Sequence, residues 1–208
     1  MANLNLYLAS CVLLLTLSCR TSTGVPVPAD SLSAEQCVLC ASLFKDLLLN
    51  ITELLKSDDL CFGIKSDAVV MRSKAETALV CAPNPTQNSS SCVMQRHSPF
   101  SEGECIKNIM RDLKYHHAAI QSYLERQLRS PEQETRLLTP TLGKIKNLME
   151  NCSLNGKNGE NEDFSEVQWE NSTFDNRQAM CKMMKGFYVR TITINRAMGY
   201  ICSGDHRK

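Results

Sequence analysis

The spacing between four helical segments constrains the fold of this 208-residue chain more than any other feature. Apolar residues recur every three or four positions over residues 34–56, 102–129, 131–152 and 176–201, as they do on the buried face of a helix. Only a turn separates the second segment from the third, so these two helices must be antiparallel neighbours. The other two connections, about residues 57–101 and 153–174, are long enough to cross a bundle from end to end. The sequence therefore predicts an all-α bundle whose four helices run up-up-down-down, with two long crossover loops.

Local signals support these helices. Ser33 and Gln36 have the spacing of a capping box before the first segment. Ser130 is a suitable N-cap for the third segment, because Pro131 follows it at the position where a helix best accepts proline. We also expect a short helix within the first crossover, over residues 67–78. The fourth segment carries methionines at helical spacing, which predict a buried face: Met180, Met183, Met184 and Met198.

The first 23 residues have the pattern of a secretory signal peptide. An apolar run from Leu6 to Leu17 is followed by small residues, and it is too short to span a bilayer. We therefore expect residues 1–23 to be removed, leaving residues 24–208 as one four-helix domain that is secreted and extracellular, with no membrane insertion. Nucleic acid is not expected as a partner, because the net charge is only +1 and Lys and Arg are not clustered.

The cysteine count is odd once the leader is set aside. Of eleven cysteines, Cys11 and Cys19 lie in the leader, and nine remain. These are Cys37, Cys40, Cys61, Cys81, Cys92, Cys105, Cys152, Cys181 and Cys202. Most should be bridged in an oxidising environment, so the bundle is expected to be disulfide-stabilised. One cysteine is left for a bond to another chain or as a free thiol. The first option would make this protein a subunit.

Four Asn-x-Ser/Thr sequons beside a signal peptide predict a glycoprotein. The acceptor candidates are Asn50, Asn88, Asn151 and Asn171. Asn151 is the doubtful one, because Cys152 lies inside its sequon and is itself a candidate for a bridge.

No motif in the chain indicates an enzyme, and no cofactor or metal is expected. A nucleophile elbow, a paired-carboxylate motif and a phosphate-binding loop are all lacking. Cys37-x-x-Cys40 lacks the strand-helix context of a redox site, and a zinc site would need two more ligands. His116 and His117 lack a glutamate at metalloprotease spacing, so we expect ordinary surface or boundary residues.

Three segments anchored by cysteines carry a resemblance to a known family. The last helix contains Cys181-Lys-Met-Met-Lys-Gly-Phe187 and then Arg190-Thr-Ile-Thr-Ile-Asn-Arg196-Ala-Met-Gly-Tyr200. The second helix contains Cys105-Ile-Lys-Asn-Ile-Met-Arg-Asp-Leu-Lys114, and Cys92 follows Cys81 by eleven positions. On these segments the chain resembles the interleukin-12 alpha subunit family over roughly residues 34–202. The resemblance implies a long-chain four-helix cytokine bundle. Four cysteines look like additions to the family pattern: Cys37, Cys40, Cys152 and Cys202.

The resemblance also implies how some cysteines pair. It implies bridges Cys61–Cys181 and Cys81–Cys105, and it implies that Cys92 bonds a beta subunit. In an up-up-down-down bundle the start of the first helix lies beside the ends of the third and fourth, so two more bridges are expected among the four additional cysteines. Sequence leaves open which of these four pairs with which. It also leaves open that Cys92 pairs with Cys37 or Cys40, so that a different cysteine is odd.

A polar stripe on the fourth helix is a candidate binding surface. Arg190, Thr193, Arg196 and Tyr200 are spaced by three, three and four residues, and we expect them to face outward, opposite the methionines. A solvated face has the same pattern, but Arg and Tyr are enriched at interface hot spots. The resemblance implies that this stripe contacts the beta subunit, with Arg196 entering an acidic pocket. It also implies that Phe174, just before the helix, contacts a receptor.

The functional expectation is a secreted cytokine alpha subunit that acts with a beta subunit, a soluble-receptor-like chain. The pair would bind cell-surface cytokine receptors and bring them together in immune signalling. One alternative is a self-sufficient monomeric helical cytokine, which should leave no cysteine over. Another is a saposin-like lipid-binding module, since such modules open with two cysteines spaced like Cys37 and Cys40. That alternative lacks the second paired-cysteine helix that such a module requires.

Overall fold

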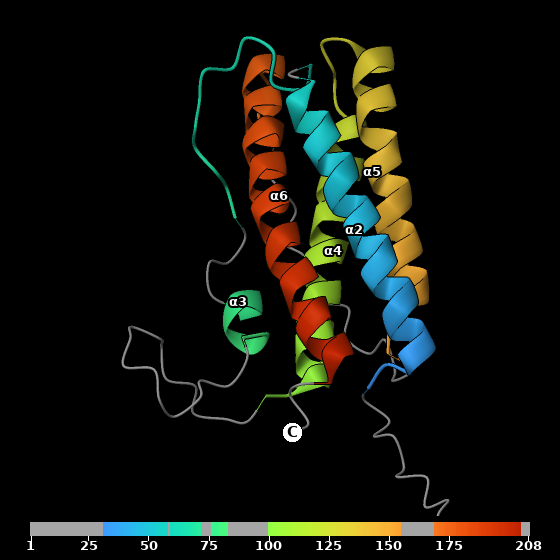
Figure 1. Cartoon of the computed structure of the whole chain (residues 1–208). Coiled ribbons are helices and arrows are strands. Elements are labelled where there is room, and N and C mark those ends of the chain that lie inside the picture. The colour runs from blue at the N-terminus through green and yellow to red at the C-terminus, as the bar shows by residue number, and fades with distance from the viewer. Residues whose placement is uncertain (1–30, 58, 72–75, 83–99, 155–168, 205–208) are drawn as a thin grey trace, which may run out of the picture.

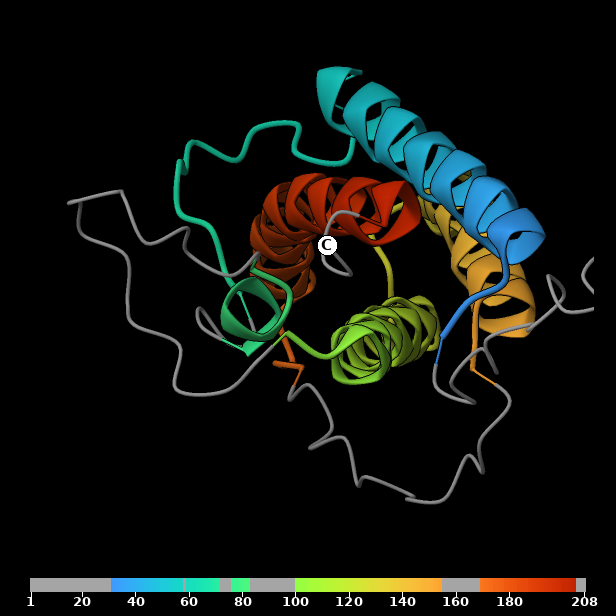
Figure 2. The same ribbon diagram turned by 60° about the horizontal axis from the view of Figure 1, so that its bottom comes forward.

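The computed structural model describes residues 31–57, 59–71, 76–82, 100–154 and 169–204. These residues form five helices and no strand: α2 (Ala34–Lys56), α3 (Glu76–Val80), α4 (Glu102–Leu124), α5 (Pro131–Asn151) and α6 (Thr173–Ser203). In Figure 1, α2 and α4 run in one direction, and α5 and α6 run in the other. Both α2 and α4 pack against α5 and α6, as the view in Figure 2 shows. The predicted all-α, up-up-down-down bundle is therefore confirmed.

Helix boundaries follow from local caps. The Ser33 hydroxyl accepts a hydrogen bond from the Gln36 backbone N–H at 3.2 Å, and the Gln36 side chain accepts one from the Ser33 N–H at 3.1 Å. This is the predicted capping box. In α6 the Ser172 hydroxyl accepts from the Asp175 N–H at 3.2 Å, so this helix begins at Thr173 and not at residue 176 as expected. Helix α4 ends at Leu124, short of the expected residue 129, because residues 125–130 reverse the chain into α5.

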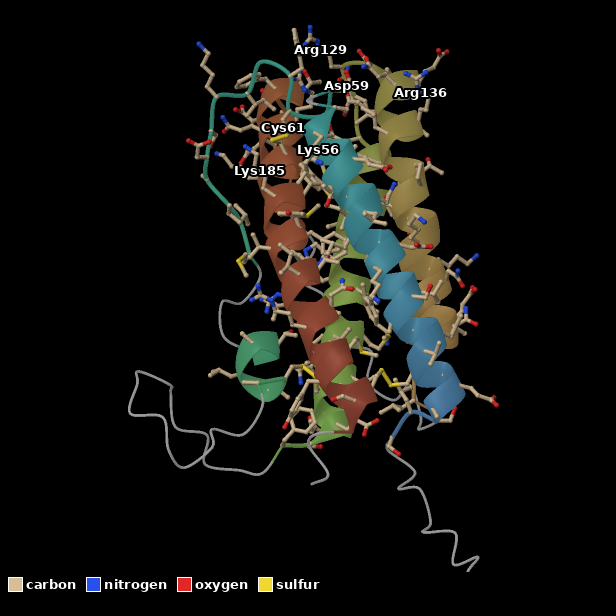
Figure 3. All side chains as sticks on the ribbon, viewed as in Figure 1. Lys56, Asp59, Cys61, Arg129, Arg136 and Lys185 are labelled. Atoms are coloured by element: carbon tan, nitrogen blue, oxygen red, sulfur yellow. A yellow bond between two sulfur atoms is a disulfide. The ribbon has the colours of Figure 1, made fainter. Side chains whose placement is uncertain are left out.

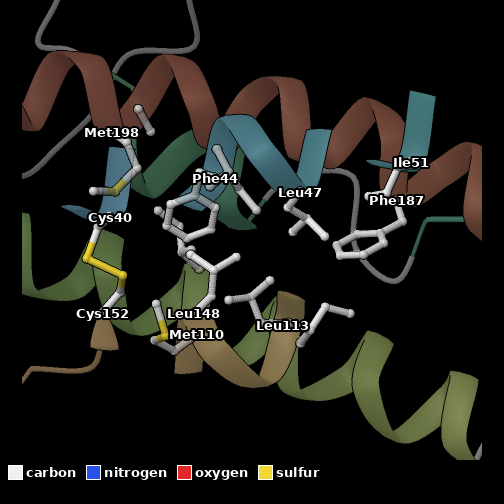
Figure 4. Close-up of a cluster of buried hydrophobic side chains, with 14 of the residues drawn as sticks. Cys40, Phe44, Leu47, Ile51, Met110, Leu113, Leu148, Cys152, Phe187 and Met198 are labelled. Atoms are coloured by element: carbon white, nitrogen blue, oxygen red, sulfur yellow. A yellow bond between two sulfur atoms is a disulfide. The ribbon is translucent and has the colours of Figure 1, made fainter. Parts of the chain in front are cut away.

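The core is a column of apolar side chains that all four long helices contribute. Phe44 and Leu47 of α2, Leu148 of α5 and Phe187 of α6 are fully buried, and Figure 4 shows them together with Leu113 of α4. The methionines of α6 belong to this core, as predicted, since all four are buried: Met180, Met183, Met184 and Met198. Removing a large side chain from such a core leaves a cavity, so substitutions in this column should destabilise the bundle.

Part of the first crossover lies directly on α6. The Val70 N–H donates to the Lys182 carbonyl at 3.2 Å, and the Lys185 ammonium donates to the Ser66 carbonyl at 2.7 Å. A Cβ atom at Gly186 would lie 1.9 Å from the Val70 carbonyl oxygen, so only glycine permits this approach. The helix expected over residues 67–78 is wrong for residues 67–71, because their backbone follows α6 instead. The short helix of this crossover is α3.

Four disulfides join the elements near the ends of the bundle. They are Cys37–Cys202, Cys40–Cys152, Cys61–Cys181 and Cys81–Cys105, with Cα atoms 4.8–5.7 Å apart. The last two pairs are the ones that the family resemblance implied. The first two join the start of α2 to the ends of α6 and α5, which is the pairing that the sequence left open. The leader, Cys92 and Asn88 lie outside the residues that the structure describes.

Candidate partner-binding surfaces

One face of α6 points away from the bundle and carries an exposed cation. Arg196 is exposed, and Val189, seven residues earlier on the same side, is exposed as well. Thr193 lies between them, half-buried, with its hydroxyl donating to the Val189 carbonyl at 3.3 Å. We refer to Val189, Thr193 and Arg196 as the α6 outer face. One turn before Val189, the backbone of Val70 in the crossover lies on Gly186, and Val70 is itself 48% exposed.

Arg190 does not belong to this face, and its expected outward position is wrong. Its side chain is buried, and its Nε lies 3.3 Å from an Asp112 carboxylate oxygen of α4. The reason is helical geometry. Two successive steps of three residues rotate the helix by about 120°, so Arg190 and Arg196 point in different directions. Arg190 instead falls between the buried residues Phe187 and Ile194.

The buried ion pair joins three segments beneath the outer face. The Thr77 hydroxyl of α3 donates to the same Asp112 carboxylate oxygen at 2.5 Å. One turn further along α4, His116 Nδ1 lies 2.7 Å from the Asp112 carbonyl, and the His116 ring stacks on Phe187 with 3.9 Å between centroids. His116 is therefore buried, and the expectation of a surface or boundary residue was wrong. This network ties α3 to α4 and α6, and so fixes the crossover that borders the outer face.

Tyr200 lies nearer the end of α6, where it also has a packing role. It is half-buried, and its ring meets that of Phe100 edge to face, with 5.2 Å between centroids. Such aromatic pairs add stability beyond the area that they bury. Of the four residues predicted to form one stripe, only Arg196 is exposed. Thr193 and Tyr200 border solvent, and Arg190 is inside.

A second surface lies at the opposite end of the bundle, where two aromatic side chains are exposed. Phe62 is 65% exposed and Phe174 is 51% exposed. Phe174 lies in the first turn of α6, and not before the helix as expected. One turn later Arg177 donates a hydrogen bond to the Phe62 carbonyl, which brings the two aromatic residues to the same end. We refer to Phe62 and Phe174 as the aromatic end.

A cavity of about 340 Å³ opens at the aromatic end. Phe62 and Arg177 line it, together with Asp59, Arg129 and Gln133. Figure 3 shows Asp59 and Arg129 at this end, close to the labelled Cys61. The lining thus combines an exposed aromatic ring with charges of both signs. A protein loop with mixed apolar and polar side chains has complementary chemistry.

Polar contacts join several segments at this end of the bundle. The Tyr123 hydroxyl donates to the Glu134 carboxylate, which also accepts from the Ser130 N–H at 3.1 Å. Burial, and then the hydrogen bond and charge of Glu134, raise the pKa of Tyr123 above its ordinary value. The end of the second crossover is held as well, because the Trp169 indole N–H donates to the Ser122 hydroxyl at 3.0 Å. Both crossovers are therefore anchored where Phe62 and Phe174 emerge.

The three sequons that the structure describes differ in accessibility. Asn171 is exposed and lies just before the N-cap of α6. Asn151 is exposed, but its amide donates to the Asn147 carbonyl at 2.8 Å. Asn50 is half-buried between α2 and α5, where it accepts a hydrogen bond at 2.8 Å from the buried Thr141 hydroxyl. Asn171 and Asn151 are thus both exposed, and they differ in that the Asn151 amide is held in a hydrogen bond within α5.

The described part of the chain offers neither a metal centre nor a membrane span. None of its helices is long and apolar enough to cross a bilayer. Within the same residues, no group of three or more His, Cys, Asp or Glu side chains is placed to hold a metal ion.

Comparison with known proteins agrees with this architecture. The sequence model of the interleukin-12 alpha subunit family matches residues 4–204. Interleukin-12 subunit alpha of Cervus elaphus is 24% identical over 148 residues, and that of Macaca mulatta is 25% identical over 146 residues. These matches cover 64% of this chain and 66% and 65% of the relatives, so the chain spans slightly less than two thirds of their length. Because the family model matches nearly the whole chain, this protein belongs to the interleukin-12 alpha subunit family, a family of cytokine subunits.

Proposed function

We propose that this protein is a secreted alpha subunit that pairs with a beta subunit, a soluble-receptor-like chain, through the α6 outer face. The observation that carries the proposal is the exposed Arg196 on the same side of α6 as the exposed apolar side chain Val189. Arginine next to apolar surface is a frequent hot-spot arrangement. Its planar guanidinium can pair with a partner carboxylate through two hydrogen bonds, which lysine cannot reproduce. A beta subunit with an acidic pocket has the matching chemistry.

A covalent bond through Cys92 supports the same pairing. The four disulfides use eight of the nine cysteines beyond residue 23, and Cys92 is left over. The alternative that Cys92 pairs with Cys37 or Cys40 is wrong in this structure, because those two are bonded to Cys202 and Cys152. A self-sufficient monomeric cytokine would have no use for an odd cysteine. We therefore favour an interchain disulfide at Cys92 over the monomeric alternative.

Co-expression with a candidate beta subunit tests the covalent bond. We expect a covalent heterodimer on non-reducing gels. Cys92→Ser should convert it into a noncovalent heterodimer that elutes at the same volume in size-exclusion chromatography. A matched variant is Ser42→Ala on the exposed side of α2, which should leave the covalent heterodimer unchanged. If peptide mapping finds Cys92 bridged within this chain, the interchain bond is excluded.

The role of Arg196 is tested in the Cys92→Ser background, where a disulfide cannot hide a loss of affinity. Removing one member of a buried charge pair costs about 2–5 kcal/mol, so Arg196→Ala should weaken noncovalent assembly well over tenfold. Arg196→Lys should recover only part of the loss. Lys107→Ala, at an exposed position on α4, is the matched control and should change little. Equal dissociation constants for the Arg196→Ala and Lys107→Ala variants would exclude Arg196 as the anchor.

We propose further that the aromatic end contacts a cell-surface cytokine receptor, so that the assembled pair brings receptors together in immune signalling. Phe62 and Phe174 support this, since they come from different elements and are both exposed at the same end of the bundle, where Phe62 lines the cavity. Phe174→Ala and Phe62→Ala should leave heterodimer assembly unchanged and reduce signalling. Leu49→Ala, which removes a 60% exposed side chain from α2, is the matched control. Full signalling by both aromatic variants would rule this surface out.

A glycan at Asn171 would lie three residues from Phe174, at the edge of the aromatic end. We propose Asn171 as the principal glycosylation site among the sequons, with Asn50, Asn88 and Asn151 as weaker candidates. Asn171→Gln should produce the largest mobility shift of the four single variants on gels. A larger shift from Asn50→Gln would contradict this proposal, because Asn50 is half-buried whereas Asn171 is exposed.

A further inference from the structure

The four disulfides differ in how exposed their cysteine residues are. Cys202 is exposed, whereas the six cysteines of the other three disulfides are at most 6% exposed. Its partner Cys37 is 7% exposed. Thiol–disulfide exchange requires a thiolate to reach one of the two sulfur atoms, so access decides which bridge reacts first. We propose that Cys37–Cys202 is a thiol–disulfide exchange site, which a dithiol reductant opens while the rest of the bundle stays closed.

The position of Cys202 in α6 favours attack there. It is the second-last residue of the helix, followed by Ser203 and by Gly204 in a left-handed conformation with φ of 69°. Helix ends open locally at a much lower free energy than helix interiors. Cys181 lies within the same helix and is fully buried, so its bridge to Cys61 lacks this access. Local opening of one turn would therefore expose the Cys202 sulfur and no other.

The exchange step can be written with atoms and electrons balanced. A reductant thiolate attacks the Cys202 Sγ, a mixed disulfide forms, and Cys37 leaves as a thiolate. The second thiol of the reductant then attacks the reductant's own sulfur in that mixed disulfide and releases Cys202. Two electrons and two protons pass from the dithiol to Cys37 and Cys202, and the reductant becomes a disulfide. Cys37 lies in the first turn of α2, where the helix dipole favours the leaving thiolate.

The opened bundle keeps its connections. Cys40–Cys152 still joins the start of α2 to the end of α5, and Cys61–Cys181 still joins the far end of α2 to α6. Near the opened bridge, the Tyr200 ring remains packed on Phe100. Exchange therefore loosens the last turn of α6 without unfolding the core. This inference does not depend on which partner α6 binds.

Partial reduction of the full secreted protein tests the order of opening. Free thiols are first blocked with iodoacetamide, and the protein is then exposed to rising concentrations of dithiothreitol for a short time. New thiols are labelled with a second alkylating agent and located by peptide mass spectrometry. We expect Cys37 and Cys202 to be labelled together, at least about tenfold ahead of the other six cysteines. Earlier labelling of any other pair, or labelling of all eight at once, would overturn the proposal.

A second measurement separates a local site from a bridge that the whole fold requires. In the double variant Cys37→Ser and Cys202→Ser, amide hydrogen exchange should quicken only in the last turn of α6 and the first turn of α2. The matched double variant, Cys61→Ser and Cys181→Ser, should quicken amide hydrogen exchange along both α2 and α6. If the first variant quickens exchange throughout the bundle, Cys37–Cys202 is not a locally opening site and the proposal fails.

Discussion

The Asp112→Ala variant tests whether the buried ion pair holds the first crossover against the bundle. Asp112 is 7% exposed and Arg190 is 3% exposed, and 3.3 Å separates the carboxylate oxygen from the guanidinium Nε. The substitution leaves the arginine charge buried without this carboxylate, which typically costs about 3–5 kcal/mol. It also removes the acceptor of the Thr77 hydroxyl, at about 1–3 kcal/mol for a buried group. These contributions share one network and do not add, so we expect a loss of about 3–5 kcal/mol.

Urea unfolding followed by circular dichroism measures this loss as a lower midpoint at an unchanged slope. The double variant Asp112→Leu with Arg190→Met should recover most of the stability, because an apolar replacement of a buried ion pair is often neutral. Glu150→Ala is the control, since its pair with Lys146 is exposed and 4.0 Å long, and should change stability by less than about 1 kcal/mol. A similarly small effect of Asp112→Ala would refute the reasoning.

Three further perturbations follow from the structure. Gly186→Ala should cost about 1–3 kcal/mol in a thermal melt, because the new Cβ would lie 1.9 Å from the Val70 carbonyl oxygen, and an unchanged melting temperature would contradict this contact. Burial, and then the charge of Lys146, lower the pKa of His117 below its ordinary value of 6.5. The unfolded chain therefore binds a proton at this histidine more readily than the folded protein does. The free energy of unfolding should fall as the pH drops below about 6.5. His117→Gln should flatten that part of the stability profile, and an identical slope would rule the histidine out. Cys61→Ala combined with Cys181→Ala should cost about 2–5 kcal/mol and lower the secreted yield, so normal yield and stability would count against the importance of the bridge.

The topology could be predicted from sequence because loop lengths limit how helices connect. The short connection between α4 and α5 requires these two helices to be antiparallel. The two long connections are long enough to cross the bundle, and the structure confirms this arrangement. The burial of the α6 methionines followed from periodicity in the same way. These features depend on patterns within one helix or one connection, which a single sequence displays directly.

Helical geometry alone separates Arg190 from Arg196, but the burial of the Arg190 charge could not be predicted, because the group that accommodates it lies on another helix. Its charge is accommodated by Asp112 of α4, 78 positions earlier in the sequence, and no local pattern announces such a pair. His116 was misplaced for the same reason, since it is covered by Phe187 of α6. The start of α6 at Thr173 could, however, have been predicted from the sequence. Ser172 and Asp175 have the spacing of an N-cap signal that the helical periodicity alone did not reach.

The disulfides that span the bundle make one another's loops shorter. Cys37 and Cys202 are 165 positions apart, but the Cys61–Cys181 bridge leaves a path of only about 45 residues between them. Closing a loop of this length costs the unfolded chain conformational entropy equivalent to about 4 kcal/mol. Closing a loop of the full 165 positions would cost about 5 kcal/mol. During oxidative folding, whichever long bridge forms first therefore carries the largest entropic cost of closure. Each later bridge joins cysteines that are already close, so the rate of disulfide formation should increase from one bridge to the next.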